Sequence, residues 1–198
     1  MSEFVVRRRP AGPPARQVRP SRGGIGRSSN RRAEQVSDAL RRGTGGDLSR
    51  RRAVAGLALG AISSFVAVAA YQTGLIRHLP EPPLPGLDSD AVDASGEAYV
   101  VLLTPDASLG IASYAVTLAL AGMGGSERAR EHPWIPLMLT AKVALDTVGA
   151  IYLTLEQLTK HKKVCAYCTV ASAFTVAMVP MVLPEAVRAW QSTRARLG

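Results

Sequence analysis

Cysteine and histidine are scarce in this chain, which has two cysteines and three histidines in 198 residues. A closed zinc site needs four ligands, most often from these two residue types, and the three histidines are widely spaced. We therefore expect no metal site with a full ligand set. The two cysteines stand close together as Cys165-Ala166-Tyr167-Cys168, at the start of a long apolar run.

This CxxC pair indicates thiol redox chemistry, because a helical turn holds two such sulfurs close enough to form a disulfide. The cationic residues 160–163 and a helix N-terminus both favour the thiolate, the form that reacts in exchange. We expect Cys165 to be the more accessible and more acidic sulfur, with Cys168 one turn deeper in apolar surroundings. Two alternatives stay open, namely a structural pair of buried cysteines or half of a metal site.

Aromatic and acidic residues are scarce in residues 1–52, which contain 14 arginines, four acidic residues and Phe4 as the single aromatic. Without aromatic side chains to stack on bases, nucleic-acid binding is not expected. The composition predicts a disordered cytoplasmic tail that touches anionic lipid, with a short helix near residues 31–42. Ser49-Arg50-Arg51-Arg52 resembles a twin-arginine export signal, but further apolar runs follow, so we interpret these arginines as a positive-inside anchor.

Residues 53–198 are nearly neutral and contain four apolar runs, each close to the roughly 20 residues that cross a bilayer. These runs predict an all-α integral membrane four-helix bundle. Pro180 is expected to kink or end the last helix, and Pro184 to close it. The four runs are residues 53–76, 107–125, 134–155 and 164–183.

The distribution of Lys and Arg predicts that both termini are cytoplasmic and that the CxxC lies at the outer face of a multi-pass protein in a bacterial inner membrane. Lys160, Lys162 and Lys163 then lie outside, against the usual bias, and their closeness to the thiols offers a functional reason. Snorkelling at the interface is an equal alternative. The outer loop, residues 77–106, is rich in proline and acidic residues, and residues 97–103 predict a half-helix over the bundle mouth.

These features together resemble the vitamin K epoxide reductase family over roughly residues 53–184. The most specific element is Val164-Cys-Ala-Tyr-Cys168 at the outer start of the fourth helix, about ten residues after Tyr152-Leu-Thr-Leu-Glu156. The resemblance implies a bundle around a quinone pocket, for a quinone of the ubiquinone or menaquinone type. It also implies that Cys168 lies nearer the quinone and that Cys165 exchanges with a partner dithiol, such as a thioredoxin-like protein.

The chain departs from this family at two points. Members usually carry a second cysteine pair in the outer loop, whereas residues 77–106 contain no cysteine. An external dithiol would then reduce the CxxC directly. In addition, Ser172 stands four residues after the second cysteine, where the animal enzymes have tyrosine, so substrate identity does not transfer.

Several residues are candidates for a quinone site. Asp106 and Tyr114, which flank Gly110 at the outer end of the second helix, suit a quinone headgroup, and Ser172 joins them by its position in the family pattern. Lys142 and Asp146 stand four residues apart on the third helix, and we interpret them as a structural ion pair rather than a proton path.

Two functions remain open from the sequence. The first is a membrane thiol oxidoreductase that passes electrons from a partner dithiol through Cys165 and Cys168 to a quinone. The second is a non-catalytic subunit that uses the same bundle in a larger membrane complex. Both share one domain organisation, with a tail at 1–52, a membrane domain at 53–184 and a short cytoplasmic tail at 185–198.

Overall fold

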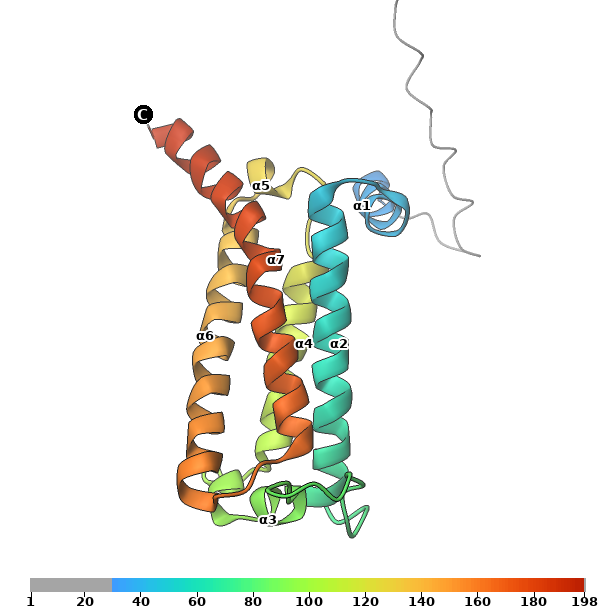
Figure 1. Ribbon diagram of the computed structural model, residues 1–198. Coiled ribbons are helices and arrows are strands. Elements are labelled where there is room, and N and C mark those ends of the chain that lie inside the picture. Colours follow the sequence, from blue (N-terminus) through green and yellow to red (C-terminus); the bar gives the residue numbers. More distant parts are fainter. Residues whose placement is uncertain (1–29, 198) are drawn as a thin grey trace, which may run out of the picture.

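A computed structural model of the protein describes residues 30–197, which form helices joined by loops and contain no β-sheet strand. Four of the helices run alongside one another as a bundle (Figure 1). The predicted all-α four-helix bundle is therefore confirmed. Its helices are α2 (Gly46–Gln72), α4 (Asp106–Gly122), α6 (Trp134–Glu156) and α7 (Ala166–Leu197).

Small residues bring these helices close together. α2 packs along both α4 and α7, and α6 packs mainly against α7. A Cβ atom at Gly60 of α2 would lie 2.7 Å from the ring of Phe174 on α7, so only glycine allows this approach. α4 and α6 touch less, which leaves space between them on the inner side of the bundle.

Three of the helices, α2, α6 and α7, are long and apolar enough to cross a membrane. The outer surface of α6 carries exposed apolar side chains, including Val148 and Ile151, as expected for contact with lipid. α4 has 17 residues, or about 25 Å, and is shorter than a usual span.

Two buried arginines hold the C-terminal end of α4. Arg51 of α2 donates to the carbonyl oxygens of Ala121 and Gly125, both at 3.0 Å. Arg128, on the short helix α5 (Arg128–Glu131), donates to those of Leu120 and Met123, both at 2.7 Å. These bonds satisfy carbonyl groups that the end of any helix leaves without a partner.

Arg128 also forms a bidentate ion pair with Glu185 of α7, with both N–O distances at 2.8 Å. The two side chains are 0% and 5% exposed. We call Arg51, Arg128 and Glu185 the arginine cluster. It joins α2, α4, α5 and α7 at the end of the bundle opposite the cysteines.

α7 continues through both prolines, so the expectation that Pro180 or Pro184 ends this helix is wrong. Residues 185–197, the predicted C-terminal tail, are helical and continuous with α7. The C-terminal part of α7 points away from the other bundle helices (Figure 1). There Ser192 donates to the carbonyl oxygen of Ala129 at 2.8 Å, which ties the extension to α5.

The loop between α2 and α4 has less helix at residues 97–103 than expected. A single 3-10 turn, η1 (Gly96–Tyr99), is followed by turns in which Leu102 and Leu103 adopt left-handed φ values of 56° and 54°. The loop's α-helical segment lies earlier, as α3 (Ser89–Asp93). The half-helix predicted over the mouth is thus replaced by two shorter pieces.

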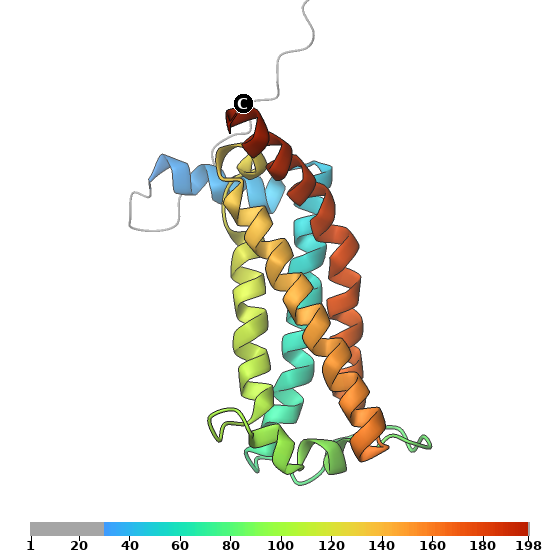
Figure 2. The same cartoon turned by 90° about the vertical axis from the view of Figure 1, so that its left-hand side faces the viewer.

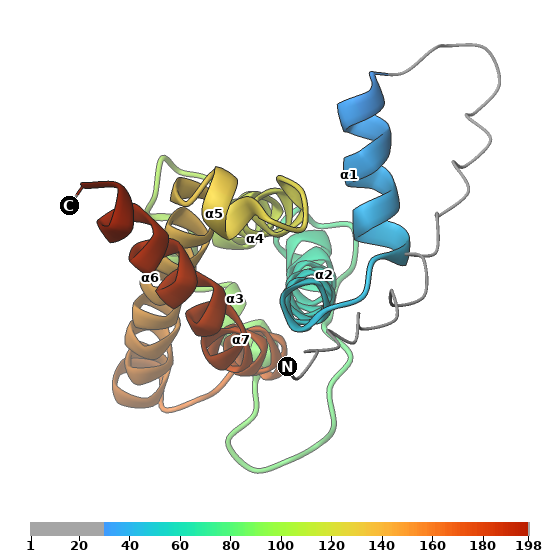
Figure 3. The same cartoon turned by 90° about the horizontal axis from the view of Figure 1, so that it is seen from above.

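The helix expected near residues 31–42 is present as α1 (Arg31–Arg42), whose first turn is capped by the side chain of Asn30. α1 lies crosswise to the bundle at the end that holds the arginine cluster (Figures 2 and 3). Arg52 donates to the carbonyl oxygens of Leu40 and Gly43 and fixes this angle. Of the tail predicted to be disordered, residues 1–52, the first 29 lie outside the described residues, and residues 46–52 form the first turns of α2.

Candidate redox site

The CxxC pair lies at the N-terminus of α7, as the sequence predicts. Cys165 directly precedes the helix, and its sulfur accepts a hydrogen bond from the backbone N–H of Cys168 at 3.2 Å. Its carbonyl oxygen accepts the N–H of Thr169 at 3.0 Å. Cys165 therefore acts as the N-cap of α7, where the helix dipole favours a negatively charged sulfur.

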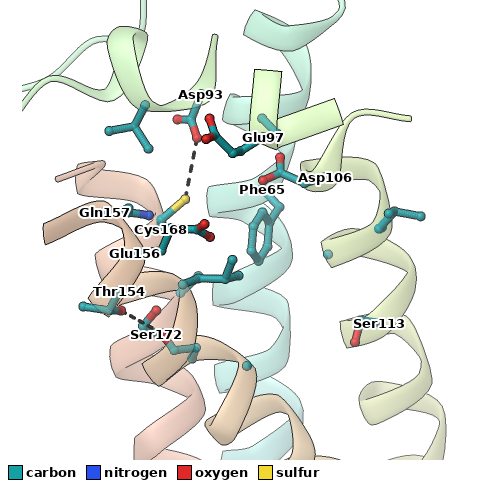
Figure 4. A pocket seen from close by; sticks show the side chains of 18 of the residues that line it. Phe65, Asp93, Glu97, Asp106, Ser113, Thr154, Glu156, Gln157, Cys168 and Ser172 are labelled. Carbon is teal, nitrogen blue, oxygen red and sulfur yellow. Dashed lines mark hydrogen bonds between the residues drawn. The ribbon is translucent and has the colours of Figure 1, made fainter. Parts of the chain in front are cut away.

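Asp93, the last residue of α3, lies against both sulfurs. The Cys165 sulfur lies 3.1 Å from its Oδ2, and the Cys168 sulfur lies 3.8 Å from its Oδ1, both as hydrogen-bonded contacts. Figure 4 shows Asp93 and Cys168 facing each other. Asp93 is only 2% exposed. Among the residues that the structure describes, no lysine, arginine or histidine forms an ion pair with it.

The pKa values of Cys165 and Asp93 are shifted in opposite directions. Hydrogen bonding to Cys168 lowers the pKa of the Cys165 thiol to about 6, against an opposing effect of burial. Burial, followed by the charge of Cys165, raises the pKa of Asp93 to about 9. These directions favour a proton on Asp93 and a negative charge on Cys165, in line with the expectation that Cys165 is the more acidic sulfur.

The prediction that Cys165 is the more accessible sulfur is wrong, because Cys165 is fully buried and Cys168 is half-buried. The outer loop covers Cys165. Ser89 accepts the N–H of Ala166 at 3.0 Å and donates to Glu81, while Leu87 and Val164 form a parallel bridge. Together these contacts, which we call the loop latch, close the outer side of the site.

Two of the three lysines beside the CxxC pair with carboxylates rather than with the sulfurs. Lys160 pairs with Glu156 on its own helical segment, and Lys163 lies 3.6 Å from Asp88 of the loop. The groups that hold the Cys165 sulfur are Asp93 and the backbone of Cys168. The functional reason expected for these lysines is therefore not supported by their contacts.

Cys168 opens onto a cavity of about 410 Å³ between α2, α4, α6 and α7. This volume is within the usual range for small-molecule sites. Apolar side chains such as Phe65, Leu109 and Leu153 form most of its wall. Polar groups gather at two levels, with Asp93, Asp106 and Gln157 near the loop and Ser113 farther along the bundle (Figure 4).

The four residues predicted to bind a quinone all line this cavity. Asp106 is bound by the Gln72 amide at 2.7 Å, and the Tyr114 hydroxyl is bonded to Thr175. A Cβ at Gly110 would lie 3.0 Å from the Phe65 ring, so this glycine lets α4 approach α2. Ser172 lies one turn below Cys168 (Figure 4). Binding of a quinone by these four residues stays a prediction.

Lys142 and Asp146 form the expected ion pair, with an N–O distance of 2.5 Å. Ser113 of α4 accepts from Lys142 at 2.7 Å and donates to Asp146 at 3.2 Å. Asp146 and Ser113 both line the cavity. The pair is thus neutralised within the bundle, in line with a structural role, while it also borders the site.

Asp93, Cys165 and Cys168 are close enough to share a metal ion, because one atom of each lies within 4.8 Å of the others. A closed zinc site needs a fourth ligand, and within residues 30–197 this group has three members. The arrangement therefore suits proton exchange between a carboxylate and two thiols better than a structural metal.

Comparison with known proteins agrees with this geometry. The vitamin K epoxide reductase family model matches residues 52–183, which include most of α2, all of α4 and α6, α7 up to Leu183 and both cysteines. The chain belongs to this family. Its members are integral membrane oxidoreductases that act between thiols and quinones. No curated protein matches the chain.

Asp93 is the residue of this family member's site that the sequence did not single out. The outer loop has several acidic residues with similar neighbours, and no local pattern separates Asp93 from Asp88 or Asp90. Its role depends on α3, which ends at Asp93 and places the carboxylate over α7, 72 residues later. Gln157, which accepts the N–H of Cys165 at 3.1 Å, was missed for the same reason.

Proposed function

We propose that the protein passes electrons from a partner dithiol through Cys165 and Cys168 to a quinone held in the cavity. The observation that carries this proposal is the position of Cys168, which lies on the cavity wall while Cys165 lies behind it under the loop. One sulfur is thus available to a membrane-soluble acceptor, and the other faces the outer loop.

The net reaction has two halves. A partner dithiol gives two electrons and two protons to the Cys165–Cys168 disulfide, and becomes a disulfide itself through a mixed-disulfide intermediate. The reduced pair then gives two electrons and two protons to the quinone, which becomes a quinol, and the Cys165–Cys168 bond forms again. The apolar wall suits the ring, and Asp106 and Ser172 are the polar groups placed to orient it.

The partner is an external dithiol protein that approaches from the outer face, since residues 77–106 offer no cysteine to relay electrons. Arginines concentrate at the other end of the bundle, which favours an inner, cytoplasmic position for both termini. Because Cys165 is covered, the partner reaches it only when the loop latch opens. The acceptor is a quinone of the ubiquinone or menaquinone type.

The experiment measures quinone reduction by the purified, full-length protein in detergent with a dithiol donor. Cys165→Ala and Cys168→Ala are each expected to abolish turnover. Ser63→Ala is the matched control, because Ser63 is exposed on α2 and donates only to the carbonyl of Leu59. Turnover that persists in either cysteine variant would disprove the proposal.

A second candidate, a non-catalytic subunit of a larger complex, is favoured by one observation, the complete burial of Cys165. Trapping separates the two functions. An enzyme with Cys168→Ala accumulates a mixed disulfide at Cys165, because the resolving thiol is missing. A structural subunit traps nothing, and deletion of residues 1–48 or of the acidic loop releases it from its complex.

A further inference from the structure

Asp93 is the carboxylate in contact with both reacting sulfurs, at 3.1 Å from Cys165 and 3.8 Å from Cys168. The other groups around it do not neutralise it. Asp106 of α4 is a second acid, held by Gln72 of α2, while Tyr71 of α2 donates to the carbonyl oxygen of Asp90. Glu97 and His161 lie at the cavity mouth, 3.8 Å from each other.

A buried carboxylic acid without a cation is costly to ionise, so it holds a proton readily. Two thiols that form a disulfide release two protons, and a quinone that accepts two electrons takes up two protons. Bulk solvent does not reach Cys165 and Asp93 directly, because they are 0% and 2% exposed. The site therefore needs an internal group that exchanges protons with the sulfurs.

We propose, on the basis of the function given above, that Asp93 is a catalytic residue that carries the proton of Cys165 through the redox cycle. It holds this proton while Cys165 is a thiolate and releases it toward the quinone when the Cys165–Cys168 bond forms. The second proton comes from the Cys168 thiol. When a partner dithiol reopens the bond, its two protons restore Asp93 and one thiol.

The charges explain the timing of this release. In the reduced site, Cys165 is a thiolate, Cys168 a thiol and Asp93 a neutral acid, so the total charge is one negative. Burial, followed by the charge of Cys165, raises the pKa of Asp93. Formation of the disulfide removes that charge, which lowers the pKa of Asp93 and favours release of its proton. The oxidised site again carries one negative charge, so two electrons and two protons leave without a change of charge inside the membrane protein.

The first test is a pH titration of the reduced, full-length protein by thiolate ultraviolet absorbance. The wild type is expected to show a step at about 6 and a second inflection at about 9, from Cys165 and Asp93. Asp93→Asn should lose the second inflection. Asp90→Asn is the matched control, because the Asp90 carboxylate is bound by His78 and the N–H of Leu79. An unchanged curve in Asp93→Asn would overturn the proposal.

The second test is quinone turnover. Asp93→Asn should lower kcat about 100-fold, the usual size of a general acid–base contribution, and leave the quinone KM within about twofold. Asp93→Glu keeps an acid in place and should retain both the inflection and part of kcat, which also guards against a folding defect. Normal kcat in Asp93→Asn would contradict the proposal. If the wild type itself reduces no quinone, the proposed function fails, and the titration alone decides the role of Asp93.

Discussion

The two ends of the bundle each contain a buried acidic residue, and the two residues differ in the partners of their carboxylates. Glu185 is held by Arg128 in a bidentate pair, and the remaining donors of Arg128 are bonded to helix carbonyls. Within residues 30–197, the hydrogen-bond partners of the Asp93 carboxylate are the two cysteine sulfurs alone. A fully paired charge keeps its protonation state and stabilises a fold, whereas an unpaired acid can gain and lose a proton. We therefore expect the end with Glu185 to stabilise the fold and the end with Asp93 to take part in the redox chemistry.

The largest effect is expected at the structural end. Arg128→Met should lower the free energy of unfolding by about 3–5 kcal/mol, because Glu185 is left buried without a partner. Denaturation in detergent measures this change. The double variant Arg128→Met/Glu185→Leu should recover much of the loss. A single variant as stable as wild type would break the comparison.

A pH-dependent effect is expected at the chemical end. The pKa of Asp93 rises from 3.8 to about 9 on folding, so its stabilising contribution is complete below pH 3.8 and is lost as pH rises. The pKa of Cys165 falls to about 6, and its contribution increases with pH above that value. Stability should therefore fall by on the order of 3 kcal/mol between pH 3.8 and about 6, and then level off.

Asp93→Asn sharpens this prediction, since it removes the acid and leaves the thiol. The fall in stability between pH 3.8 and about 6 should disappear, and stability should rise with pH above that range. Denaturation at several pH values provides the measurement, with Asp90→Asn as the control. A wild-type profile that is flat throughout would show that Asp93 is not a perturbed acid.

A smaller effect is expected for the loop latch. Ser89→Ala removes the acceptor for the N–H of Ala166 in the first turn of α7 and should cost about 1 kcal/mol, similar to the loss of an N-cap side chain. The alkylation rate of Cys165 should rise several-fold, because the loop covers this sulfur. Ser95→Ala in the same loop is the control. Equal rates in the two variants would show that the latch does not control access.

The smallest effect is expected for the ion pair in the middle of the bundle. Lys142→Met/Asp146→Leu removes both charges together, so the free energy of unfolding should change by less than about 1 kcal/mol. Single variants should be worse than the double variant. A double variant that loses quinone turnover but remains folded would indicate that this pair takes part in the redox reaction.

The bundle was predictable because each span corresponds to one continuous apolar run, whose length is close to that needed to cross a bilayer. The position of the CxxC at a helix N-terminus was predictable for the same reason. The extension of α7 was not, since Pro184 removes one backbone donor but α5 holds the helix beyond it through Ser192. The half-helix was misplaced because apolar residues 100–103 point outward instead of continuing a helix.

The arginine cluster and Asp93 could not be identified from sequence because both depend on partners far along the chain. Arg51 looked like one of several anchoring arginines, yet it bonds to Gly125, 74 residues later. Asp93 and Cys165 are 72 residues apart. Because Asp93 was not identified, the sequence led us to attribute the reactivity of the thiols to the nearby lysines. The contacts in the structure attribute it instead to Asp93, a residue of the loop.

The N-cap position of Cys165 links the first turn of α7 to the electron content of the site. A thiolate is a strong acceptor for the N–H of Cys168, and it interacts favourably with the helix dipole. A disulfide sulfur is uncharged, so we expect the helix start to be held less firmly after electrons pass to the quinone. Ser89, which binds the same turn, would then release more easily. The loop latch would then open more readily in the oxidised protein, which is the form that reacts with the next dithiol.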